Sequence, residues 1–67
     1  MTLAEKFSSN MKHERKRRKL SQSQLSRRAG VSTSYVSMLE RNQRTPPLET
    51  LERIARALQV PATKLLH

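Results

Sequence analysis

The 67-residue chain contains only one glycine and three prolines, and this scarcity limits what it can fold into. A sandwich or barrel of short strands requires many tight turns, which glycine and proline supply. A helical domain requires few of them. A chain of this length also forms one domain at most, and it buries about 60% of the surface that it exposes when unfolded. We therefore predict an all-α fold in which residues 1–67 form a single compact bundle of five short helices.

Periodic apolar residues mark the outer helices. Leu3, Phe7 and Met11 recur every four residues and predict a helix that runs to about Lys19. A final short turn of helix is expected over residues 62–66. Between them, two prolines precede an apolar series at three-and-four spacing that predicts another helix. Its members are Leu48, Leu51, Ile54, Ala55 and Leu58.

Capping residues divide the middle of the chain into two more helices. Ser21, followed three residues later by Gln24, matches a capping box and predicts a helix over residues 22–29. Gly30 is the only glycine of the chain and stands where a helix ends in the left-handed conformation. The segment therefore predicts a helix followed by a tight turn.

A second helix is expected directly after this turn. Ser32 is a good N-cap for a helix over residues 33–41. Asn42 then stands at its end, and asparagine is the next-best residue after glycine for a left-handed helix end. The chain thus contains a predicted helix, turn and helix between about residues 21 and 42.

Two opposite charges fall in the core-facing phase of different helices. Arg15 lies four residues after Met11, and Glu40 lies four residues after Val36. Neither charge is tolerated alone in an apolar environment, because an unpaired buried charge costs several kcal/mol. We therefore predict a structural ion pair between Arg15 and Glu40.

The charge balance indicates a polyanionic partner. Fourteen Lys and Arg residues stand against five acidic residues, which gives a formal net charge of +9. The densest run, residues 12–19, holds six basic residues in eight. Like charges at this spacing weaken a helix, so a contact with a polyanion is favoured for part of the run.

The same composition argues against several other classes of protein. The chain has no Cys and only two His, so it lacks the residues for the usual metal-ligand and catalytic clusters. We expect no cofactor, no metal site, no small-molecule substrate and no enzymatic activity. No apolar run approaches the ~20 residues of a membrane span, and the N-terminus does not match a signal peptide.

The order and spacing of three segments resemble the XRE-type helix-turn-helix family of phage repressors and Cro proteins. The segments are Leu-Ser-Gln-Ser-Gln-Leu at 20–25, Tyr-Val-Ser-Met-Leu-Glu-Arg-Asn at 35–42 and Pro-Leu-Glu-Thr-Leu at 47–51. The middle segment also resembles the controller proteins of restriction-modification systems. The resemblance implies a lambda-repressor-like domain and the same ion pair between Arg15 and Glu40.

The resemblance also implies which side chains meet DNA, because in this family the helix over 33–41 lies in the major groove. The residues implied to contact base edges are Thr33, Ser34, Ser37 and Met38. Backbone contacts are expected from Gln22, Tyr35, Arg41, Asn42, Gln43 and Arg44. For Gln22 there is an independent reason, since free amides at a helix start favour a phosphate.

The leading hypothesis is a sequence-specific regulator of transcription that binds a palindromic operator in double-stranded DNA as a homodimer. A dimer would use the surface around Leu65 and Leu66 or form only on DNA. The resemblance implies a cytoplasmic, nucleoid-associated protein of a bacterium or phage. An alternative is an antitoxin-type interaction module that binds a toxin protein and autoregulates its operon. An RNA-associated protein and a membrane-surface helix are less favoured, because aromatic residues are few and a complete globular pattern follows the basic run.

Overall fold

Four α-helices and a closing 3-10 helix make up the computed structural model, which describes residues 1–67 and contains no strand. The elements are α1 Leu3–Arg17, α2 Gln22–Ala29, α3 Thr33–Glu40, α4 Leu48–Ala57 and η1 Ala62–Leu66. The predicted all-α class is confirmed. Of the five expected helices, the last is a 3-10 helix, in which the Lys64 amide donates to the Pro61 carbonyl three residues before it at 3.0 Å.

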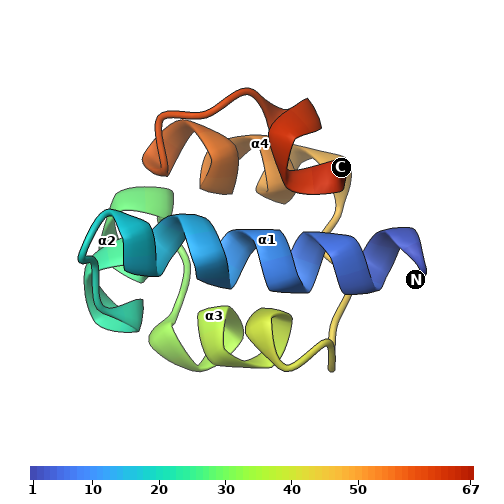
Figure 1. Ribbon diagram of the computed structural model, residues 1–67. Coiled ribbons are helices and arrows are strands. Elements are labelled where there is room, and N and C mark those ends of the chain that lie inside the picture. The colour runs from blue at the N-terminus through green and yellow to red at the C-terminus, as the bar shows by residue number, and fades with distance from the viewer.

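The helices are arranged around α1, which runs across the front of the molecule in Figure 1. α4 and η1 lie on one side of α1, and α3 lies on the opposite side. α2 crosses near the carboxyl end of α1 and packs against both α3 and α4. Because α1 and α2 cover only its inner side, α3 keeps an outer side that no other element covers.

Hydroxyl side chains fix where α2 and α3 begin. The Gln24 amide donates to Ser21 Oγ at 3.0 Å, and the Ser21 amide donates to Gln24 Oε1 at 2.8 Å. This is the predicted capping box. Ser32 Oγ accepts from the Tyr35 amide at 3.0 Å and caps α3 in the same way. Both helices therefore start at the residues that the sequence indicates.

Left-handed residues end all four α-helices. Gly30 has φ +73° after α2, and Asn42 has φ +58° after α3, as predicted. Gln59 follows α4 with φ +60°. Lys19 also has φ +56°, so α1 ends at Arg17 and the prediction that it continues to Lys19 is wrong. A left-handed residue cannot continue a right-handed helix.

The core consists of twelve buried apolar residues contributed by every helix. They are Phe7, Met11, Leu20, Leu25, Ala29, Val36, Leu39, Leu51, Ile54, Ala55, Leu58 and Leu65. Two apolar residues of the predicted stripes are absent from it, because Leu3 is 60% exposed and Leu48 is 71% exposed. Each is the first residue of its helix, and the neighbouring elements cover only the turns that follow.

Glu14 is buried although it lies within the basic run. It comes three residues after Met11, so it shares the inward face of α1, and only 4% of it is exposed. Arg18 donates to its carboxylate, and Arg17 lies 3.8 Å from it. The hydrogen bond from Arg18 holds the pKa of Glu14 below its ordinary value. Part of the positive charge of the run is therefore neutralised inside the fold.

Opposite substitutions at two left-handed positions test this backbone geometry. Gly30→Ala is expected to lower the free energy of unfolding by about 1–2 kcal/mol, because an L-residue is strained at this φ. The added methyl would also displace the Arg53 guanidinium, which lies 2.5 Å from the Cβ position. Lys19→Gly is expected to raise that free energy by up to about 1 kcal/mol, since it removes the same strain.

Urea unfolding followed by circular dichroism measures both changes. The two substitutions check each other, because one removes a glycine from a left-handed position and the other introduces a glycine at one. A loss of stability in Lys19→Gly would contradict the left-handed backbone at that position.

Candidate nucleic-acid interface

A buried ion pair joins α1 to α3. Arg15 Nε donates to Glu40 Oε2 at 2.6 Å, and Arg15 Nη2 donates to Glu40 Oε1 at 3.0 Å. The side chains are 10% and 3% exposed. Arg15 Nη1 also donates to the Leu20 carbonyl at 2.8 Å. The pair is bidentate, a geometry that fixes the orientation of both side chains as well as their distance.

The same carboxylate extends this contact to the start of α2. Gln22 Nε2 donates to Glu40 Oε1 at 3.1 Å. Arg15, Glu40 and Gln22 therefore form one hydrogen-bonded network, called here the Arg15–Glu40–Gln22 network, that connects α1, α3 and α2. It holds the first turn of α2 in a fixed position relative to α3.

The first turn of α2 offers donors to an anion. The backbone N–H groups of Gln22 and Ser23 come before the first residue that can bond within the helix, and the capping box uses the N–H groups of Ser21 and Gln24 instead. The positive end of the helix dipole adds to the attraction. The side chain of Gln22 retains its second amide hydrogen, because only one is used on Glu40.

Thr33 and Ser34 are exposed at the start of α3. Thr33 Oγ1 lies 3.1 Å from Ser26 Oγ, which donates its own proton to the Ser23 carbonyl at 2.7 Å. Because Ser26 has a single hydroxyl proton, Thr33 must be the donor in the contact between them. Toward solvent, Thr33 therefore presents acceptor lone pairs and a methyl group.

Ser37 and Met38 are half-buried along α3, and an arginine is positioned next to them. Arg41 Nη1 donates to Ser37 Oγ, and Arg41 Nε and Nη2 donate to Gln43 Oε1 at 3.2 and 3.1 Å. Three of its five N–H groups are thus used, and one remains on each terminal nitrogen. The structure brings Ser37, Arg41 and Gln43 together at the carboxyl end of α3.

The other predicted contact residues lie in different surroundings. The Tyr35 ring is half-buried against the core. The side-chain amide of Asn42 lies 3.4 Å from Ser8 Oγ, which donates its single proton to the nearer Ala4 carbonyl at 3.1 Å, so the end of α3 lies beside α1. Arg44 is exposed in the loop that follows.

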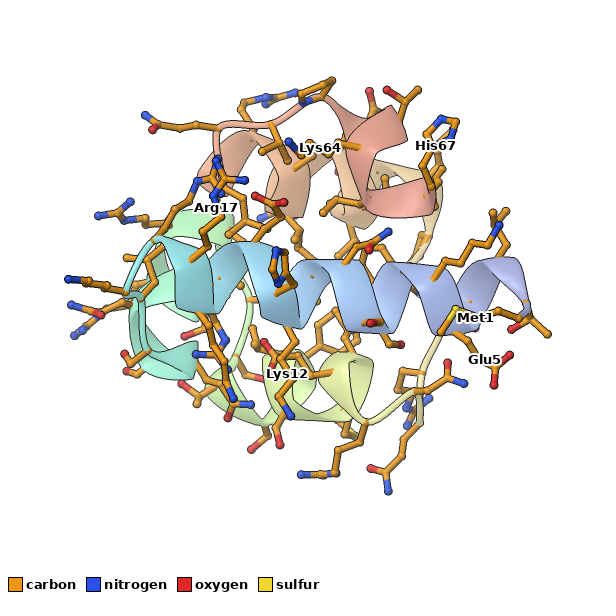
Figure 2. All side chains as sticks on the ribbon, in the orientation of Figure 1. Met1, Glu5, Lys12, Arg17, Lys64 and His67 are labelled. Atoms are coloured by element: carbon orange, nitrogen blue, oxygen red, sulfur yellow. The ribbon has the colours of Figure 1, made fainter.

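The basic run of α1 divides between two sides of the molecule. Lys12 extends toward the side on which α3 lies, whereas Arg17 extends toward the opposite side (Figure 2). Lys16 follows Lys12 by one helical turn and shares its stripe. Only part of the run therefore lies beside the outer side of α3.

The sequence did not reveal Ser26 as a partner of Thr33 or Glu40 as a partner of Gln22. Both contacts join residues of α2 to residues of α3. The only signal for the first contact was that Ser26 and Thr33, seven residues apart, both have a hydroxyl group. The second depends on how closely α2 and α3 pack, which periodicity within each helix does not specify.

Comparison with known families agrees with this geometry. The family model described as Helix-turn-helix matches residues 11–65. The chain belongs to this helix-turn-helix family. It is 42% identical over 52 residues to the immunity repressor protein of Bacillus phage phi105, a match that covers 78% of this chain and 36% of that protein. The chain spans about one third of the length of the first curated relatives that it matches.

Two solved structures share the fold closely. The restriction-modification controller protein C.AhdI from Aeromonas hydrophila is 32% identical, with a TM-score of 0.89 over 92% of this chain and 94% of that one. The regulator of biofilm formation SinR, solved in complex with DNA, is 35% identical, with a TM-score of 0.86 over 91% and 98%. The predicted resemblance to phage repressors and controller proteins is confirmed.

No group of three His, Cys, Asp or Glu side chains lies close enough together to hold a metal ion. None of the helices is both long enough and apolar enough to cross a membrane.

Removing the carboxylate of Glu40 tests how much the Arg15–Glu40–Gln22 network contributes to stability. Glu40→Ala is expected to lower the free energy of unfolding by about 3 kcal/mol, because it leaves the Arg15 guanidinium buried and unpaired. Glu49→Ala removes an equal charge from an exposed position of α4 and is expected to change stability by less than about 0.5 kcal/mol. Thermal and urea unfolding of the two variants provide the comparison. If both substitutions lower the free energy of unfolding by the same small amount, the network does not determine how the helices are arranged.

Proposed function

We propose that the chain is the DNA-binding domain of a regulator of transcription, with α3 inserted in the major groove of a specific operator. The Arg15–Glu40–Gln22 network is the observation that carries this proposal. It holds the amide-bearing start of α2 at a fixed distance from the uncovered side of α3. A phosphate anchor and a base-reading helix must have such a fixed relation if the anchor is to set the register of the helix.

Phosphate anchors on two sides of α3 would bracket the groove. On one side are the amides of Gln22 and Ser23 at the start of α2. On the other is the loop after α3, where Asn42 and Arg44 are exposed. Tyr35 can add its hydroxyl, for which no partner is found within the chain. The complex of the similar protein SinR with DNA supports DNA as the ligand.

Base reading falls to the outer residues of α3: Thr33, Ser34, Ser37 and Met38. Thr33 presents acceptors and a methyl group, which suit an amino group or a thymine methyl. Met38 offers a further apolar contact. None of these residues makes the bidentate hydrogen bonds that discriminate bases most strongly. We propose that Arg41 supplies that contact from the end of α3, through the two N–H groups left free by Ser37 and Gln43.

A second copy of the chain is proposed as the partner on DNA. An apolar groove of about 310 Å³ lies between the start of α1, the loop after α3 and the start of α4. Its lining includes the buried Phe7 and Leu51 and the two strongly exposed leucines, Leu3 and Leu48. One surface thus contains both protruding apolar side chains and a hollow to receive them, which a two-fold symmetric contact requires. The groove also adjoins Leu66, close to the surface expected from the sequence.

Selection of bound duplexes from a random pool tests the proposed function. We expect recovery of an inverted repeat whose half-sites lie about one helical turn, or a multiple of it, apart. With about 4 phosphate contacts per half-site, log affinity should fall against log salt with a slope of about −7. Lys12→Gln should reduce that slope, while Arg17→Gln is the control on the opposite side of α1. Recovery of no motif, or a slope near zero, would contradict the proposal.

The dimer surface has a separate test. Leu48→Glu is expected to weaken binding to the complete inverted repeat by about tenfold or more, because it places a charge in an apolar contact. Binding to an isolated half-site should change little. Glu49→Gln, at the neighbouring position, is the control. If Leu48→Glu weakens binding to the complete repeat and to the half-site equally, this groove is not the contact between the two copies.

A further inference from the structure

Four arginines surround a hollow between α2 and α4. Its volume is about 320 Å³, within the range of small-ligand sites. The walls carry Arg27 and Arg28 from the end of α2 and Arg53 and Arg56 from α4. The small residues Ala29, Gly30 and Ala57 complete the lining. Because these three residues are small, the guanidinium groups are the dominant chemical feature of the hollow.

None of these four arginines forms an ion pair with a carboxylate. The ion pairs of the chain use only Glu14 and Glu40, which belong to α1 and α3. On α4, Glu52 lines a neighbouring hollow together with Arg56 and Val60, but neither Glu52 nor Glu49 forms an ion pair. Four like charges around one hollow repel each other, so binding of an anion there would relieve an unfavourable interaction.

The hollow is separate from the side of α3 proposed to meet DNA. α2 packs against α3 and also against α4, and the hollow lies at the contact with α4. Figure 1 shows α4 and α3 on opposite sides of α1. The arginine cluster is therefore not accounted for by the major-groove contact or by the anchors beside it.

One of the arginines is already oriented by the protein. Arg53 Nη2 donates to the Gly30 carbonyl at 3.2 Å, in the turn between α2 and α3. This contact reduces the freedom of the side chain and leaves its other N–H groups for a ligand. Arginine forks match the geometry of phosphate oxygens and can bind them in a bidentate manner.

We infer that this arginine hollow binds a pair of neighbouring phosphate groups. Two sources present that chemistry: a free polyphosphate ligand of small size, and the backbone of a DNA segment outside the operator contact. The inference does not depend on the proposed operator, because binding is measured separately from sequence-specific recognition.

Isothermal titration of the full chain with inorganic triphosphate tests this inference. The double variant Arg53→Gln/Arg56→Gln should weaken triphosphate binding by about tenfold or more, since the loss of a single charged hydrogen bond is already worth about a factor of ten. Arg17→Gln/Lys64→Gln removes the same net charge from exposed positions outside the hollow and should change binding less than about twofold. If Arg53→Gln perturbs the turn, Arg27→Gln/Arg56→Gln removes two charges without touching the bond to Gly30.

A second titration with a duplex of scrambled sequence distinguishes the two sources. If the hollow variants lose affinity only for triphosphate, the ligand is a free polyphosphate. If they lose affinity only for the duplex, the ligand is the DNA backbone. Equal losses in the hollow and control variants in both titrations would overturn the inference, because the attraction would then come from the net charge alone. Binding to the selected operator, measured in parallel, keeps this result distinct from the proposed function.

Discussion

The bidentate pair between Arg15 and Glu40 is the interaction on which the rest of the structure depends. A guanidinium and a carboxylate removed from water must each be fully hydrogen-bonded, and here they satisfy one another together with Leu20 and Gln22. The demands of two buried charges thereby fix three helices against each other. An apolar contact of similar size would stabilise the bundle but would tolerate more variation in the distance between them.

That fixed arrangement separates affinity from specificity. Much of the positive charge lies on the solvent-facing surfaces of α1, α2 and α4, where it attracts a polyanion whatever its sequence. The uncovered side of α3 is mainly uncharged, and its hydroxyls are partly committed to internal partners such as Ser26 and Arg41. Selectivity in our proposal rests on few groups held in defined orientations. The arginine hollow between α2 and α4 shows that the remaining charge is also locally organised.

Features that depend on neighbouring residues in the chain were predictable. The capping box at Ser21, the left-handed end at Gly30 and the start of α3 all follow from local hydrogen bonding and backbone sterics. The ion pair was also predictable, because helical phase alone places Arg15 and Glu40 inward. The end of α1 was not predicted correctly. Lysine has no intrinsic preference for φ +56°, so its conformation at Lys19 is imposed by the chain on either side.

The sequence by itself determined the helices, their order, the inward charges and a net charge suited to a polyanion. Only the tertiary structure decided that Thr33 donates to Ser26 and that four arginines share one hollow. These outcomes depend on distances between helices. Periodicity assigns each residue to a face of its own helix, but the packing of the whole core sets which faces meet and how closely.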